Sequence, residues 1–191
     1  MSDFLMSCSC RGRRPKHVAS SAAHSRPHLI ADLLRSRDVA RVLVAPTGFG
    51  KSTVAAEYAQ VVFSFRQTFW VNCESPCFLR DLDAGIIASR VVEIGGAGSL
   101  VVFDDLPRMD ASRVEVFSEV VDELLAAGSE VLVTCTPTCD AYSDLHRDRV
   151  KLSARRFLLT DDEMKHTVRE TDSPHAKCRA ACVAWGSDDG G

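Results

Sequence analysis

The stretch that decides the fold is Val42-Leu43-Val44-Ala45-Pro46-Thr47-Gly48-Phe49-Gly50-Lys51-Ser52-Thr53. A short apolar run leads into a loop with two glycines, and the loop leads into Lys-Ser and a segment that can form a helix. Glycine adopts backbone angles that other residues disfavour and leaves room for an anion to approach backbone N–H groups. The pattern therefore predicts a phosphate-binding P-loop between a strand and a helix, whose N-terminus attracts the same anion.

The residues of a P-loop have separate roles toward a nucleotide. Backbone N–H groups surround the phosphates, the lysine brings a positive charge to the β- and γ-phosphates, and the following hydroxyl binds Mg²⁺. Ala45 replaces the first glycine of the strict pattern, which the loop tolerates because this residue ends the strand. We predict ATP and Mg²⁺ as cofactors, Lys51 as a catalytic residue and Ser52 as a magnesium ligand. The predicted nucleotide-binding set is Ala45, Pro46, Thr47, Gly48, Phe49, Gly50, Lys51, Ser52 and Thr53.

A second apolar run, residues 100–103, ends in two carboxylates about fifty residues after the P-loop. A continuous apolar run is typical of a strand that is buried on both faces, and ligands of open α/β sheets bind at the C-terminal ends of such strands. This is the Walker B pattern. We expect Asp104 to hold Mg²⁺ through water, and Asp105 to act as a catalytic residue that orients or deprotonates the attacking water.

The rest of the sequence alternates between helical and extended patterns. Strands are predicted at residues 42–44, 67–73, 100–103 and 130–135 and within 150–159. Helices are predicted at 26–38, at 51–64, as one helix from Leu79 through Ile86 and Ile87 to Gly95, from a cap at Asp110 or Ser112 to Gly128, at 140–147, and after a capping box at 160–163. This order predicts a three-layer α/β sandwich with a parallel five-stranded sheet, the fold of a P-loop NTPase of the additional-strand (ASCE) class.

Composition divides the chain into three segments. We expect a disordered basic leader at 1–25, the P-loop domain at 26–160 and a helical, partly disordered extension at 161–191; a transit-like or nucleic-acid-touching arm is the alternative for the leader. Residues 1–28 carry a charge of about +4, so the remainder of this chain of net charge −3 is acidic, at about −7. An acidic body gives no reason to expect direct DNA binding by this segment. No apolar run approaches the length of a membrane span and no signal core is present, so we expect a cytoplasmic protein without a membrane partner.

Three cysteine pairs share one spacing: Cys73/Cys77, Cys135/Cys139 and Cys178/Cys182. Close pairs of this kind can form zinc sites. However, Cys73 and Cys135 fall at the ends of predicted buried strands, where cysteine behaves as a small hydrophobic residue. We therefore interpret these two as core residues.

Five segments together resemble the nucleotide-binding domain of STAND ATPases, and most closely the MalT-like, LuxR-type bacterial regulators. They are Arg26-Pro27-x-Leu29, residues 45–52, residues 101–106, residues 131–134 and Phe157-x-x-Thr160-x-x-Glu163. The resemblance implies an ATP-binding switch whose nucleotide state controls assembly, so that the partners are the nucleotide and a nucleotide-dependent homo-oligomer. It also adds Arg26 to the nucleotide-binding residues. The sequence shows no helix-turn-helix after this domain, so a role in transcription is implied by the family resemblance alone.

One departure from that family bears on the rate of hydrolysis. In those proteins the fourth strand commonly ends in Thr-Ser-Arg, whereas the corresponding strand of this chain, at residues 130–135, leads into Thr134-Cys135-Thr136. The arginine expected to sense the γ-phosphate is therefore missing. We expect slow, Mg²⁺-dependent hydrolysis, unless a neighbouring subunit supplies Arg155 or Arg156.

Two other functions fit the same motifs. A superfamily 2 helicase-like ATPase fragment is suggested by the phosphate loop and by residues 133–137, although Asp105 stands where that family has glutamate. The other alternative is a nucleotide-binding interaction module that does not hydrolyse ATP. Hydrolysis stimulated by nucleic acid would favour the helicase, and nucleotide-dependent self-association would favour the switch.

Overall fold

The computed structural model describes residues 26–35, 39–62, 68–95, 98–139 and 149–158. Helices and strands alternate along this part of the chain. They are α2 (Pro27–Leu34), β1 (Ala40–Val44), α3 (Lys51–Val62), β2 (Thr68–Asn72), α4 (Pro76–Asp83), α5 (Ile87–Gly95), β3 (Leu100–Leu106), α6 (Ala111–Ala126), β4 (Glu130–Cys135) and β5 (Arg149–Leu152), with the short 3₁₀ turns η1 (Pro137–Cys139) and η2 (Ala154–Phe157).

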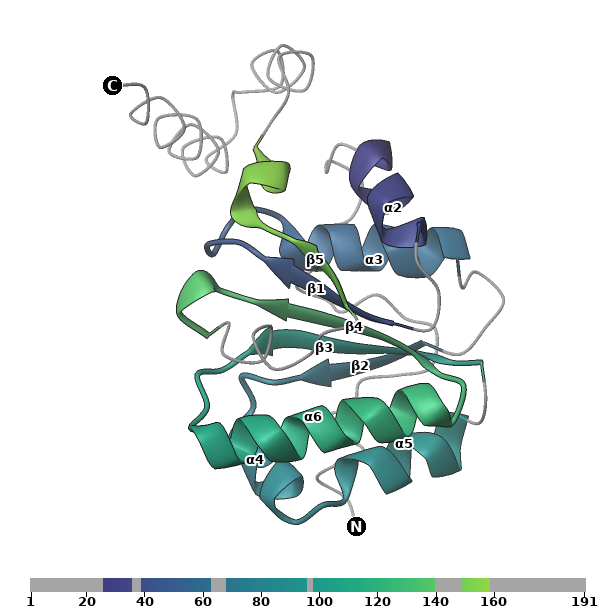
Figure 1. Ribbon diagram of the computed structural model, residues 1–191, viewed down its shortest axis with the longest axis vertical. Helices are drawn as coiled ribbons and strands as arrows, with labels where there is room; N and C mark the ends of the chain where they lie inside the picture. Colours follow the sequence, from purple (N-terminus) through teal and green to yellow (C-terminus); the bar gives the residue numbers. More distant parts are fainter. Residues whose placement is uncertain (1–25, 36–38, 63–67, 96–97, 140–148, 159–191) are drawn as a thin grey trace.

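The five strands form one parallel sheet in the order β2-β3-β4-β1-β5. Helices α4, α5 and α6 cover one face of the sheet, and α2 and α3 cover the other (Figure 1). The predicted three-layer α/β sandwich with a parallel five-stranded sheet is therefore confirmed. Strand β4 lies between the P-loop strand β1 and the Walker B strand β3. Strand β4 is therefore the additional strand of the predicted class.

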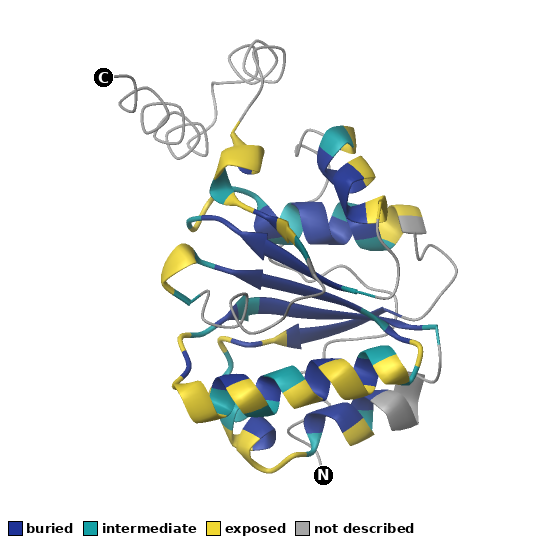
Figure 2. Cartoon of the chain, in the orientation of Figure 1, coloured by how far each residue is buried: buried dark blue, intermediate teal, exposed yellow. Residues whose placement is uncertain are grey.

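The sheet has a separate hydrophobic core on each face because successive side chains of a strand point to opposite sides. In β1, Val42 and Val44 join the core under α4, α5 and α6, whereas Leu43 joins the core under α2 and α3. The central strands are buried along their length (Figure 2). Burial on both faces explains why these strands appear in the sequence as continuous apolar runs.

The helix predicted to run from Leu79 to Gly95 is wrong, because the structure has two helices there, α4 and α5. Helix α4 begins earlier than expected, with the Ser75 side chain accepting a hydrogen bond from the Cys77 N–H at its N-terminus. It ends at Asp83, shortly before Gly85, whose φ of 65° is left-handed. The N–H groups of Gly85 and Ile86 bond back to the carbonyls of Leu82 and Asp81, which is the Schellman arrangement that ends a helix.

The other helix boundaries agree better with the sequence patterns. Asp110, and not Ser112, caps α6 by accepting a hydrogen bond from the Arg113 N–H, and the helix ends just before Gly128 as expected. Strand β5 falls at the start of its predicted range. The predicted leader, the helix at 140–147, the capping box at 160–163 and the C-terminal extension lie outside the described residues.

Of the helices in the described ranges, none is both long and apolar enough to cross a membrane.

Candidate functional site

The loop between β1 and α3 has the backbone shape that its two glycines predict. Gly48 and Gly50 have φ angles of 88° and 83°. No atom lies within 4 Å of where a Cβ would stand at either position, so the backbone angle and not crowding requires glycine there. Strand β1 ends at Val44, one residue before the predicted end at Ala45. Ala45 is buried, and its N–H still bonds to the Cys135 carbonyl of the neighbouring strand.

Lys51 lies under this loop as the first residue of α3 and is 4% exposed. Its ammonium Nζ is 3.4 Å from the Pro46 carbonyl oxygen of the loop. The same Nζ is 3.7 Å from Asp105 Oδ1 at the end of β3. A buried cation therefore joins the loop to the predicted Walker B strand.

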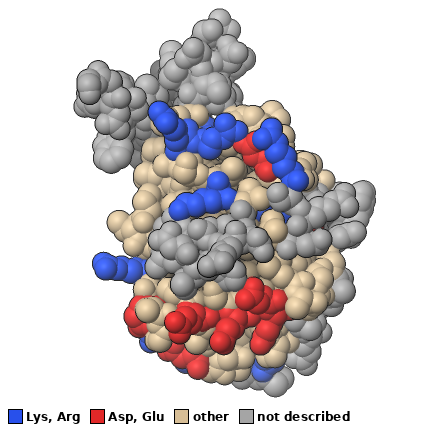
Figure 3. All heavy atoms as spheres, viewed as in Figure 1, with Lys and Arg blue, Asp and Glu red and all other residues tan. Residues whose placement is uncertain are grey.

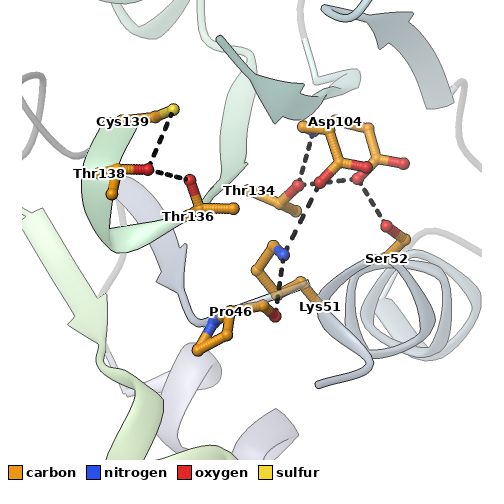
Figure 4. Close-up of polar contacts among 9 residues, drawn as sticks. Pro46, Lys51, Ser52, Asp104, Thr134, Thr136, Thr138 and Cys139 are labelled. Carbon is orange, nitrogen blue, oxygen red and sulfur yellow. Dashed lines mark hydrogen bonds and ion pairs between the residues drawn. The ribbon is translucent and has the colours of Figure 1, made fainter. Parts of the chain in front are cut away.

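Ser52 and Asp104 meet beside this lysine (Figure 4). The Ser52 hydroxyl donates a hydrogen bond of 2.9 Å to Asp104 Oδ1, although the two residues are 52 positions apart. Asp104 is 3% exposed. The structure thus brings together the two side chains that the sequence assigns to Mg²⁺.

The donor set suits Mg²⁺. Hydroxyl and carboxylate oxygens are hard ligands, and Mg²⁺ usually takes one or two protein ligands together with phosphate oxygens and water. Within the described residues, no three or more His, Cys, Asp or Glu side chains are grouped so as to hold a metal ion.

Asp105 follows in an unusual backbone conformation. Its φ is 55°, the left-handed region that residues other than glycine seldom adopt. Its side chain is 38% exposed, so the carboxylate reaches solvent while it contacts Lys51. Catalytic groups often occupy such strained positions.

Sequence reasoning missed one residue that contacts both aspartates, which is Thr134 on β4. It is fully buried, and its hydroxyl donates to Asp104 Oδ1 at 2.8 Å and accepts from the Asp105 N–H at 2.8 Å. The sequence directed attention to Thr136, whose hydroxyl bonds instead to that of Thr138. The available signal was a polar residue within the otherwise apolar run at residues 131–135.

The structure shows Arg26 in contact with η2 and α3. Its guanidinium donates to the carbonyls of Phe157 and Leu158 at 2.8 and 3.1 Å, and its backbone N–H donates to Glu57, further along α3. Arg26 thus ties the start of α2 to η2, and its role toward a nucleotide stays a prediction. Of the two arginines considered for a neighbouring site, Arg156 contacts Asp32 on α2, whereas Arg155 is exposed on η2.

The four described cysteines are free thiols: Cys73, Cys77, Cys135 and Cys139. Cys73 and Cys135 are buried in the core under α4, α5 and α6, which confirms their interpretation as core residues. The remaining cysteines lie outside the described residues.

Comparison with known proteins found similar solved structures but no family. No protein-family model matches the chain, and no curated protein matches it. Solved structures similar to it include the E. coli MS115-1 HORMA:CdnC:Trip13 complex, at 15% identity over 86% of this chain and 62% of that one, with a TM-score of 0.47. C. elegans PCH-2 is 14% identical over 75% of this chain and 45% of that one, with a TM-score of 0.39. Rhizobiales Trip13 is 16% identical over 85% and 63%, with a TM-score of 0.42.

The chain therefore spans less than two thirds of the length of these structures. At such low identity the likeness indicates nothing about ligands or partners. The strand order, the glycine loop and the carboxylates at the end of β3 define the class of fold, which is that of a P-loop NTPase with an additional strand.

Proposed function

We propose that this chain is a nucleotide-binding module that takes Mg²⁺ and ATP at the loop between β1 and α3. The observation that carries the proposal is the 2.9 Å hydrogen bond from Ser52 to Asp104. A chance match to a P-loop pattern gives no reason for its serine to meet a strand-end aspartate beside a buried lysine. A site for Mg²⁺ and phosphate requires that meeting.

Each side chain then has a task that follows from its position. The loop around Gly48 and Gly50 presents backbone N–H groups to the phosphates, and Lys51 offsets their negative charge. Ser52 and Asp104 hold Mg²⁺, which draws electron density from the phosphate oxygens when it is bound. Asp105, whose carboxylate reaches solvent, orients or deprotonates the attacking water.

We further propose that this module is a switch that hydrolyses ATP slowly. Lys51 is the cation that the structure brings to this cluster, and Thr136 stands where STAND ATPases commonly have an arginine. The five-segment resemblance to MalT-like, LuxR-type regulators supports a module whose nucleotide state controls self-association. In that assembly Arg155 of a second copy would complete the site.

Thermal unfolding tests the proposal directly. Ligand that binds the folded state alone at about 100 times its Kd adds about 2.7 kcal/mol to the free energy of unfolding. For a chain of this size that corresponds to a rise in Tm of roughly 5–10 °C with Mg²⁺ and ATP. Lys51→Ala should abolish most of the rise by removing a charge from the phosphate site.

Lys151→Ala is the matched control, because it removes the same charge from an exposed position on β5. It should keep the full rise in Tm. A folded wild-type chain whose Tm does not move at millimolar ATP and Mg²⁺ would refute the proposed function.

A further inference from the structure

Strand β3 contains a bulge at the candidate site. Phe103 pairs with Val133 and Leu106 pairs with Cys135, so Asp104 and Asp105 together stand opposite the single residue Thr134. A bulge puts one extra residue into a strand, interrupts the regular ladder of backbone hydrogen bonds and redirects the neighbouring side chains. Both aspartates of the site lie in this bulge.

The Thr134 hydroxyl replaces the missing part of the ladder. A threonine hydroxyl has one hydrogen to donate and two lone pairs that accept. Here the hydrogen goes to Asp104 Oδ1 and one lone pair accepts the Asp105 N–H, each at 2.8 Å. Because Thr134 is fully buried, water cannot readily take over either bond.

The two bonds fix the two carboxylates in different ways. Asp104 Oδ1 is held by two hydroxyls, Thr134 from β4 and Ser52 from α3, which sets the orientation of its side chain. Asp105 is held through its backbone, which keeps φ at 55° and leaves its carboxylate 3.7 Å from the Lys51 ammonium. One side chain of the neighbouring strand thus connects both aspartates.

We propose that Thr134 is a positioning residue of this site: its hydroxyl orients Asp104 toward Mg²⁺ and holds Asp105 in the left-handed conformation that aims its carboxylate into the site. Thr134 acts through the aspartates and does not touch the phosphates itself. The inference rests on the proposed function, since the orientation matters for catalysis only if Mg²⁺ and ATP bind.

Thr134→Val removes the hydroxyl with almost no change in shape, and Thr134→Ser keeps the hydroxyl. Mg²⁺ is titrated into each protein with a fluorescent ATP analogue, and single-turnover hydrolysis is measured at saturating Mg²⁺. Loss of a hydrogen bond that supports a metal ligand typically costs about 10- to 100-fold in metal affinity or activity. We expect Thr134→Val to need at least about tenfold more Mg²⁺ and to hydrolyse more slowly by a similar factor.

Binding of ADP without Mg²⁺ separates positioning from a general loss of structure. It depends on the loop and Lys51, so Thr134→Val should bind ADP at least as tightly as the wild type does. Thr134→Ser should resemble the wild type in all three measurements. Thr68→Val is the matched control. It makes the same change at a buried threonine at the start of β2, the opposite end of the sheet from the site, and should leave Mg²⁺ dependence and turnover unchanged.

Failure of the inference differs from failure of the proposed function. If the wild type binds Mg²⁺ and ATP, but Thr134→Val has the same Mg²⁺ midpoint and rate, the positioning role is refuted while the function stands. If the wild type binds no nucleotide, both are refuted. Thr134→Ala is a second variant without the hydroxyl, to be used if the valine protein does not fold. A Thr134→Ser protein whose Mg²⁺ midpoint is shifted about tenfold would also overturn the inference.

Discussion

The contact between Lys51 and Asp105 sets up a competition for one cation. Lys51 is almost fully buried, and its ammonium lies 3.7 Å from a carboxylate that solvent still reaches. Phosphates of an incoming nucleotide need the same ammonium. We therefore expect Asp105 to oppose nucleotide binding, even though its proposed role is to help the water attack once the nucleotide is bound.

Asp105→Asn should for this reason bind ADP more tightly than the wild type and hydrolyse ATP more slowly. Ion pairs with an exposed partner contribute about 0.2–1 kcal/mol, so the gain in affinity should be about 1.5- to 5-fold. Asparagine tolerates left-handed backbone angles, so the variant should keep the backbone conformation of residue 105. Titration with a fluorescent ADP analogue in the absence of Mg²⁺ measures the effect, with Glu119→Gln on the exposed face of α6 as the control. Weaker binding by Asp105→Asn would show that the carboxylate does not compete for Lys51.

At the scale of elements, a buried polar cluster holds the sheet together at the end opposite the candidate site. Arg41 of β1 is 2% exposed, donates to the Leu33 carbonyl of α2 and pairs with Glu130 of β4 at 3.0 Å. The Tyr58 hydroxyl of α3 donates to the same Glu130 carboxylate at 2.8 Å, and the Arg41 guanidinium lies over the Tyr58 ring. Two strands and two helices thus meet at one cluster.

Tyr58 gives this cluster a pH dependence. Burial raises the pKa of the phenol above its ordinary value, the Arg41 cation opposes the rise and the hydrogen bond to Glu130 adds to it. The folded chain therefore holds the phenol proton more tightly than the unfolded chain. The resulting stability is fully present below the unfolded pKa of about 10 and is lost as the pH rises above it.

Tyr58→Phe lacks this proton, so its free energy of unfolding should fall less steeply than that of the wild type above pH 10. One group contributes a slope of at most about 1.4 kcal/mol per pH unit. Urea unfolding of both proteins between pH 8 and 11 measures the difference, and the curves below pH 9 serve as the internal control. Parallel curves up to pH 11 would contradict the raised pKa.

The elements also show which features the sequence could predict. The strand–loop–helix at residues 42–62 and the carboxylates at the end of β3 follow from local patterns, because glycine angles and apolar runs are properties of adjacent residues. The bulge at Asp104 and Asp105 depends on how β3 pairs with β4, and no local pattern contains that register. Thr134 was missed for the same reason. The break at Gly85, by contrast, was visible as a glycine within the predicted helix.

At the scale of the whole molecule, the described residues on the face drawn in Figure 3 have their charges separated between two ends. Acidic side chains gather over α6 and α4, and basic side chains gather over α2, β5 and η2 (Figure 3). The exposed residues on α6 include Glu115, Glu119, Asp122 and Glu123, and those at the basic end include Arg35, Lys151, Arg155 and Arg156. Because opposite charges attract, we expect one copy to associate with the next through these two ends, and we expect the attraction to weaken with salt.

ATP hydrolysis should therefore depend on protein concentration. Charge on the transferring phosphoryl group must be stabilised, and an arginine from a second copy can be worth about 10³ to 10⁵ in rate. Arg156 contacts Asp32 of its own chain, so Arg155 is the arginine of η2 that we expect to reach a neighbour. The specific rate should be low at nanomolar protein, rise with concentration at low salt, and fall back when salt is added.

Arg155→Ala should stay at the low rate at every concentration, while Arg35→Ala, which removes the same charge from the same basic end, should still rise to the high rate, at a somewhat higher protein concentration. Thr136→Arg should raise the rate at low concentration, because it supplies an arginine within one chain. Sedimentation in the presence of ATP and of ADP measures the association itself. A fast wild-type rate that is independent of concentration would reject the switch, and a rate that rises instead on adding DNA or RNA would favour the helicase-like alternative.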